Sequence, residues 1–210
     1  MSQQRFLSVR RPASERWGAD RGFTAVEVLV VALLCSIMAA LAIPFTSNTL
    51  KFFRVDGDSR ALVNGISLAK MRAASDFAYA RFYADLGART YKVQTWSKAT
   101  NSWVDEGGLS ILSTQDNFGF GAAAVAPPDA PSPIAMAPAC LDNAGNAINN
   151  TACVVFNSRG LPVDGTGTPT GQDSMYITDG STTFGVAVSA SGQVRLWRSP
   201  ATLTPTWTQQ

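Results

Sequence analysis

The sequence predicts an α+β protein in which a long N-terminal helix, half membrane-embedded and half amphipathic, packs on a C-terminal antiparallel β-sheet domain. Residues 23–45 form an apolar run, and from residue 62 onward apolar side chains recur every three or four positions, as on one face of a helix. After Gly87 the apolar period changes to two, which is typical of strands. We therefore expect four segments: a removable basic leader at residues 1–22, a membrane helix at 23–45, an amphipathic helical continuation at 46–86 and a β head at 87–210.

The apolar run is long enough to cross a bilayer. At 1.5 Å per residue it would extend about 34 Å, and the hydrocarbon core is about 30 Å thick. Pro44, at its end, cannot donate a hydrogen bond to Ala40, so we expect a helix kink there. Residues 1–22 hold five arginines against two acidic residues, and positive flanks stay in the cytoplasm. We therefore expect a single-pass membrane protein whose head lies outside the cytoplasm.

One carboxylate, that of Glu27, interrupts the apolar run near its start. A carboxylate inside a membrane span costs about 2.5–3.5 kcal/mol on insertion scales, so it requires a partner, and the run contains no basic residue. A cut between Gly22 and Phe23 would create an α-amine four residues from Glu27. That amine is poorly placed for Glu27 of its own helix, but the amine of a neighbouring copy could reach it. The segment therefore indicates a processing site joined to an assembly signal.

These residues resemble the type IV pilin family, whose mark is Gly-Phe-Thr-x-x-Glu before an apolar helix, present here as Gly22, Phe23, Thr24 and Glu27. The basic leader and Pro44 belong to the same resemblance. It implies a pilin-like fold, cleavage after Gly22 by a prepilin peptidase, N-methylation of Phe23, and an inner-membrane location with a periplasmic head. Loss of the leader, which carries +3, would change the formal charge from +2 to −1. The basic pI of the full sequence is therefore not a nucleic-acid signal.

Two other interpretations of the apolar run stay open. One is a plain transmembrane anchor. The other is a conventional secretory signal, because Ala40-Leu41-Ala42 is a plausible small-x-small cleavage site, and cleavage there would leave a soluble periplasmic protein that begins at Ile43. Neither interpretation accounts for Glu27.

Beyond the apolar run the sequence predicts a helix and then short strands. We expect a break at residues 56–59, followed by a helical face made of Leu62, Ile66, Ala69, Ala73 and Phe77. Strands are predicted at residues 90–96, 109–112 and 153–156, a turn around Trp103 within residues 101–108, and loops at 119–139 and 160–171. The clearest pattern is a closing three-strand meander at 174–178, 182–189 and 193–198, with an Asp-Gly turn between its first two strands.

The cysteines agree with an oxidising compartment. Cys140 and Cys153 flank a polar loop, and a disulfide closing a loop of that size would contribute about 3 kcal/mol on the chain-entropy model. Two free thiols or half of a metal site are the alternatives. Because the sequence has no His and no third cysteine nearby, we expect no metal site. Cys35, inside the apolar run, is interpreted as a small lipid-compatible residue.

The C-terminal half carries a second, more degenerate resemblance, to the FimT/GspH group of minor pilins and pseudopilins. It rests on residues 188–198, which are similar to that group's closing hairpin, on residues 155–160, and on the helix at 61–75. The group often has Gly-Arg-x-Arg where this chain has Gly192-Gln193-Val194-Arg195, so one arginine is missing. Some members are implicated in DNA uptake and others in type II secretion.

That departure bears on DNA binding. The candidate DNA contacts are Arg159, Arg195 and Arg198. Arg195 and Arg198 fall on opposite faces of one strand, and a DNA site needs several phosphate contacts because each adds only a modest increment. We therefore favour a solvated hairpin face with Trp197 packed down, and DNA is a possible but not a favoured partner.

Enzyme chemistry is not favoured. Without His, the sequence lacks the usual general base, and Ser67-x-x-Lys70 lacks the companion motifs of Ser–Lys acyl enzymes. We expect a non-enzymatic filament subunit with no cofactor, which fits a type II secretion pseudopilus of the GspH kind. The alternative is a FimT-like minor pilin acting in DNA uptake or pilus assembly. The implied partners are the prepilin peptidase, other pilin or pseudopilin subunits and inner-membrane lipid.

Overall fold

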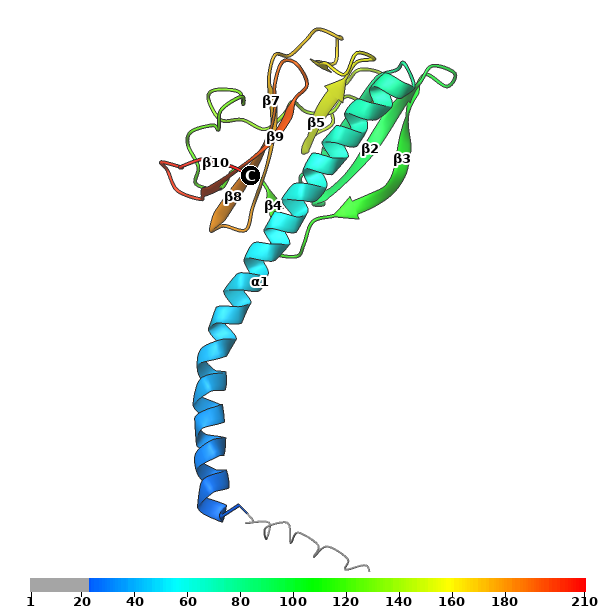
Figure 1. Ribbon diagram of the computed structural model, residues 1–210. Helices are drawn as coiled ribbons and strands as arrows, with labels where there is room; N and C mark the ends of the chain where they lie inside the picture. Colours follow the sequence, from blue (N-terminus) through cyan, green and yellow to red (C-terminus); the bar gives the residue numbers. More distant parts are fainter. Residues whose placement is uncertain (1–22) are drawn as a thin grey trace, which may run out of the picture. The chain divides into compact units, whose positions relative to one another are not determined.

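The structure is a computed structural model that describes residues 23–210, except for the side chains of residues 42–48 (Figure 1). Over these residues one α-helix is followed by ten strands, which form two antiparallel sheets of five strands each. The α+β class predicted from the sequence is therefore confirmed. The predicted leader, with the cleavage residue Gly22, lies outside the described residues.

The chain divides into two compact units at Phe45–Thr46, and each is described by itself. In the first unit the helix α1 (Ala25–Ser75) begins directly after Thr24. Among the described side chains, no helix is long and apolar enough to cross a membrane. The predicted span extends beyond Leu41 into residues whose side chains are not described, and these include Pro44, the predicted kink.

In the second unit α1 buries the predicted apolar face. Leu62, Ile66, Ala69 and Ala73 have no exposed surface. The predicted break at residues 56–59 is wrong, because the helix runs through it, and the Arg60 guanidinium pairs with the carboxylate of Asp56 one turn earlier at 2.9 Å. Phe77 is also not on this face: it follows the helix end, has a φ of 47°, and is 75% exposed.

The first sheet has the order β3-β2-β1-β5-β6. Its strands are β1 (Ala80–Asp85), β2 (Thr90–Ser97), β3 (Ser102–Ile111), β5 (Thr151–Phe156) and β6 (Pro162–Val163). Strand β1 corrects the predicted helical continuation to residue 86 and the predicted start of the head at residue 87. It is the central strand, paired with β2 on one side and with β5 on the other. The hydrogen bonds of those two ladders satisfy the backbone polar groups of β1, which a continuing helix would have satisfied within itself.

The predicted turn around Trp103 is wrong as well. Trp103 lies in β3 directly opposite Trp96 of β2, and the two rings meet edge to face with their centroids 5.2 Å apart. Such cross-strand aromatic pairs stabilise antiparallel strands. The chain reverses earlier instead, and Asn101 takes the positive φ (48°) that the turn requires.

The second sheet has the order β10-β9-β8-β7-β4. Its strands are β4 (Asn117–Phe118), β7 (Asp173–Thr178), β8 (Thr182–Val188), β9 (Val194–Pro200) and β10 (Thr208–Gln209). The predicted meander is confirmed as β7-β8-β9, extended by β10. Figure 1 shows the second half of α1 lying over strands of the head.

One core joins the helix to both sheets. Ile66 of α1, Phe82 of β1 and Phe184 of β8 are each fully buried in one apolar cluster. Gly65 allows the close approach of helix and sheet, because a Cβ there would lie 2.7 Å from the Phe82 ring. The opposite, outer face of the first sheet carries polar side chains, among them Arg81 of β1.

Candidate functional site

The start of α1 combines a helix cap with a free carboxylate. The Thr24 hydroxyl accepts a hydrogen bond from the Glu27 backbone N–H at 3.2 Å, so Thr24 is the N-cap and Glu27 is the third helical residue. Thr-x-x-Glu is the spacing of a capping box. Within residues 23–210, however, the Glu27 carboxylate makes no hydrogen bond or ion pair. The cap explains Thr24, and the Glu27 carboxylate remains available to another molecule.

The large apolar side chains along this part of α1 are exposed in the single chain. Phe23 is 78% exposed and Leu41 is 72% exposed, and the large apolar side chains between them are also exposed. A contiguous apolar surface of this size marks a site of interaction with lipid or protein.

The three candidate DNA-contacting arginines are not gathered on one surface. Arg195 forms an ion pair with Asp129 and donates to the Gln193 amide at 3.0 Å. On the other face of β9, the Arg198 guanidinium lies 4.4 Å from the ring centre of Phe52, in a cation–π contact. The Arg159 side chain has no polar partner within residues 23–210.

Trp197, between these arginines, is packed down as expected from the sequence. It is 9% exposed and lies in a small cluster with Ala130 and Ala187, against which Trp207 also packs. It is therefore not available to stack on an exposed base.

The turn at Gly160 and the turn at Gly192 meet each other in space. Gly192, in the β8–β9 turn, has a φ of 74°, and a Cβ there would collide with the carbonyl oxygen of Gly160. Lys70 of α1 binds this pair of turns, since its ammonium donates a hydrogen bond to the Gly192 carbonyl at 2.8 Å. That bond gives Lys70 a structural role and accounts for its place beside Ser67 without acyl-enzyme chemistry.

Cys140 and Cys153 are joined, as predicted, with an S–S distance of 2.03 Å. The bridge attaches the loop after residue 138 to strand β5. The next residue, Leu141, uses its backbone carbonyl to accept a hydrogen bond from Arg81 at 2.6 Å. The disulfide thus positions one wall of a polar site on the outer face of the first sheet.

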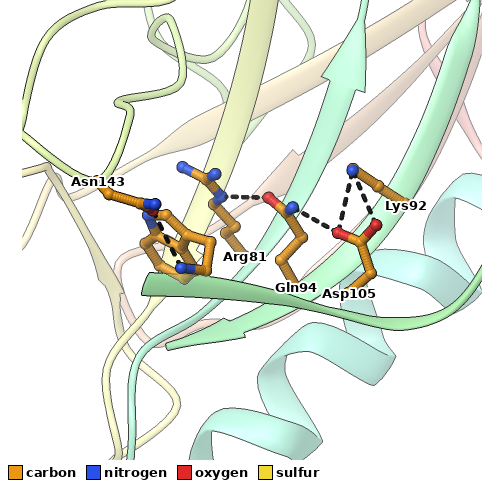
Figure 2. Close-up of polar contacts among 6 residues, drawn as sticks. Arg81, Lys92, Gln94, Asp105 and Asn143 are labelled. Carbon is orange, nitrogen blue, oxygen red and sulfur yellow. Dashed lines mark hydrogen bonds and ion pairs between the residues drawn. The ribbon is translucent and has the colours of Figure 1, made fainter. Parts of the chain in front are cut away.

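That polar site is a chain of contacts across three strands (Figure 2). Arg81 Nε donates to the Gln94 side-chain oxygen at 2.8 Å, and the Gln94 amide donates to Asp105 at 2.6 Å. Lys92 completes the chain with a 3.0 Å ion pair to Asp105. The hydrogen bond from Gln94, followed by the contacts with Lys92, lowers the pKa of the Asp105 carboxyl. All four residues face away from the helix.

Arg81 is a cation held deep in this face. It is 3% exposed, and its guanidinium lies 4.0 Å from the ring centre of Trp103. Burial lowers the pKa of Arg81 to about 10, so the group stays charged at neutral pH. Asn143 contacts the backbone of Trp103, because its side-chain oxygen accepts a hydrogen bond from the Trp103 backbone N–H at 3.1 Å.

The network borders a cavity of about 430 Å³. Its floor is the outer face of the first sheet and its walls are the loops around Leu141 and Gly165. Sequence reasoning missed this site entirely. The one available signal was the alternation Ala80-Arg81-Phe82-Tyr83, which is short and contains a helix-favouring alanine.

No known protein-family model matches the chain, and no curated protein is similar to it. Two solved structures of the minor pseudopilin EpsH from the type II secretion system of Vibrio cholerae are similar in part. One has a TM-score of 0.42 and 11% identity, covering 73% of this chain and 96% of that chain. The other has a TM-score of 0.35 and 11% identity, covering 75% of this chain and 96% of that chain. No family assignment follows from them.

Proposed function

We propose that this chain is a non-enzymatic subunit of a type IV filament machine, of the minor pilin or pseudopilin kind, acting in a type II secretion pseudopilus as a GspH-type subunit. The observation that carries the proposal is the Glu27 carboxylate, which has no partner within residues 23–210 and lies at the start of an uncovered apolar helix that follows Gly22-Phe23. The mechanism is assembly.

The apolar helix needs two successive environments. Burial of apolar surface contributes about 25 cal/mol per Å², so side chains as exposed as Phe23 and Leu41 favour either lipid or the core of an assembly. In the proposed sequence of events the precursor waits in the inner membrane. After the prepilin peptidase has removed the leader, the same apolar side chains pack against those of neighbouring subunits.

Glu27 supplies the specificity of that packing. Cleavage after Gly22 creates the Phe23 amine, and the Glu27 carboxylate of one subunit neutralises the amine of the next. In a low-dielectric core, leaving one member of such a pair without its partner costs about 3–5 kcal/mol. The pair would therefore favour subunits that are both cleaved and correctly staggered.

The head favours protein partners over DNA. Arg195 and Arg198 have their guanidinium groups engaged within the head, on opposite faces of β9. Of the three candidates only Arg159 is free within residues 23–210, and one phosphate contact adds little affinity. The alternative, a FimT-like minor pilin in DNA uptake or pilus assembly, would require these arginines to be released.

The test uses Glu27→Gln in cells that express the partner subunits. Gln keeps the shape of Glu but removes the charge, and the cap that Thr24 makes to the backbone N–H of residue 27 does not depend on that side chain. The variant should be cleaved and inserted like the wild type, with methylated Phe23 as the first residue, yet fail to co-purify with partner pilins. Glu27→Asp, one methylene shorter, should assemble in part.

Two results would contradict the proposal. Co-purification of Glu27→Gln at the wild-type level would remove the assembly role of the charge. A mature chain that begins at Ile43 would instead support the secretory-signal interpretation. DNA binding is tested separately by gel shift of the full chain in detergent at two salt concentrations. Tight, salt-sensitive binding that Arg195→Ala abolishes would favour the DNA-uptake alternative.

A further inference from the structure

The cavity on the outer face of the first sheet holds a buried carboxylate that lacks a cation. Asp173, at the start of β7, lines the cavity and is 3% exposed. One of its oxygens accepts the Thr170 hydroxyl at 3.0 Å, and the other has no partner within residues 23–210. Burial raises the pKa of Asp173, and no neighbouring cation offsets this. A largely buried carboxylate that no cation neutralises is costly, so a cationic ligand would gain free energy by pairing with it.

Two further carboxylates make the lining acidic. Asp142 is hydrogen-bonded by the backbone N–H and side chain of Asn146, and Asp164 by the side chain of Thr166 and the backbone N–H of Thr168. These bonds lower the pKa of both carboxyls, so both stay ionised.

Arg81 is the one basic residue among the lining residues. Its Nε and one terminal nitrogen are already bonded to Gln94 and to the Leu141 carbonyl. With all three aspartates ionised, the lining carries a formal charge of −2.

Aromatic side chains form the other end of the cavity floor. Trp96 lies opposite Trp103 in the ladder, and the Trp96 backbone N–H donates to the Tyr79 carbonyl at 2.7 Å. The three aromatic residues therefore form a row across neighbouring strands. Tryptophan and tyrosine ring faces attract ammonium and guanidinium groups, as the Arg81–Trp103 contact in this site shows.

We propose that this cavity binds a basic side chain, a lysine ammonium or an arginine guanidinium, presented by another protein. The charged end pairs with the free oxygen of Asp173, and the methylene stem lies along the apolar wall that Val155 and Val163 provide. A neutral sugar could also use aromatic rings and carboxylates, but it would leave the charge of Asp173 unpaired and would gain nothing from an acidic lining. This inference does not depend on the filament role, because it concerns the head alone.

The test is a titration of the full chain in zwitterionic detergent, followed by NMR of the indole N–H signals of Trp96 and Trp103. The signals are assigned with Trp96→Phe and Trp103→Phe. The probes are N-acetyl-lysine amide and N-acetyl-arginine amide, with N-acetyl-glutamine amide and maltose as neutral comparisons. Both cationic probes should produce saturable shifts, with an affinity at least tenfold higher than that of either neutral probe.

The matched variant is Asp173→Asn, whose amide oxygen can still accept the Thr170 hydroxyl. It should weaken binding of the cationic probes at least tenfold, whereas Asp76→Asn, an exposed change at the end of α1, should have no effect. The proposal is overturned if neither cationic probe shifts the two indoles, or if maltose binds as well as the cations. Equal binding by the wild type and Asp173→Asn would also overturn it. The comparison between probes uses the wild type alone, so it still tests the proposal if Asp173→Asn fails to fold.

Discussion

Asp116 offers a test of how burial acts on one carboxyl group. It lies between β3 and β4, is 1% exposed, and its Oδ2 is buried without a hydrogen-bond partner in the described residues. Burial, as the largest cause, and the neighbouring Asp58 carboxylate on α1 together raise the pKa of Asp116 to about 7. Asp179 adds to this effect and Arg54 opposes it. The carboxyl is therefore protonated in the folded head over a range where the unfolded chain is ionised.

The sign of the pH dependence follows from this difference. Because the folded-state pKa is raised, the contribution to stability is fully present below the ordinary value of 3.8 and is lost as the pH rises through about 7. At 1.36 kcal/mol per pKa unit the ceiling is about 4 kcal/mol. An effective dielectric constant near 20 and the coupling to Asp58 lower this ceiling, and we expect Asp116 to contribute about 2 kcal/mol to the free energy of unfolding.

The perturbation is Asp116→Asn, which supplies a permanent donor to the Asp58 carboxylate. At pH 8.5 it should raise the free energy of unfolding by about 2 kcal/mol, or Tm by about 4–8 °C for a head of this size. At pH 5 the wild-type carboxyl is already protonated, so the difference should be much smaller. Circular dichroism melts of the full chain in detergent at both pH values measure this, with Asp76→Asn as an exposed control. A Tm that falls at pH 8.5, or the same difference at both pH values, would refute the reasoning.

Two further predictions concern the turns of the head and its disulfide. Gly192→Ala should lower stability by about 2–4 kcal/mol, because it adds a collision with the Gly160 carbonyl to the cost of a positive φ, whereas Gly180→Ala, with a φ of 88° and open space around it, should cost about 1 kcal/mol. If chemical denaturation gave the same loss of unfolding free energy for both variants, the collision with the Gly160 carbonyl would add no cost and the reasoning would be wrong. Replacing both Cys140 and Cys153 by Ala should lower stability by about 3 kcal/mol without changing membrane fractionation, and unchanged melting would contradict the chain-entropy estimate.

The predictions that succeeded depend on short-range patterns. Leu62, Ile66, Ala69 and Ala73 lie one helical turn apart, so their shared face is visible in the sequence and is buried in the structure. The closing meander has a period of two and an Asp-Gly turn, which together determine strand, turn and register. The disulfide follows from two cysteines separated by 13 residues in a chain that leaves no other nearby partner.

The predictions that failed depend on distant partners. Strand β1 is a strand because β2 and β5 flank it, and β5 lies about seventy residues further along the chain. Residues 56–59 have turn-forming side chains, yet the helix continues because Val55 and Leu62 on either side are buried in the same core. In both places tertiary packing overrides a weak local preference.

The sequence by itself determined the elements whose signal is local: the helical face, the meander, the bridge between cysteines, and a single carboxylate in an apolar run that contains no basic residue. Only the tertiary structure decided where Arg81 and Asp173 lie, since the cavity that they share is assembled from six strands and two loops. Periodicity is a property of neighbouring residues, whereas the burial of a charge depends on which remote segments fold over it. For that reason the sequence carried only one short signal of the acidic, aromatic cavity, the alternation at residues 80–83.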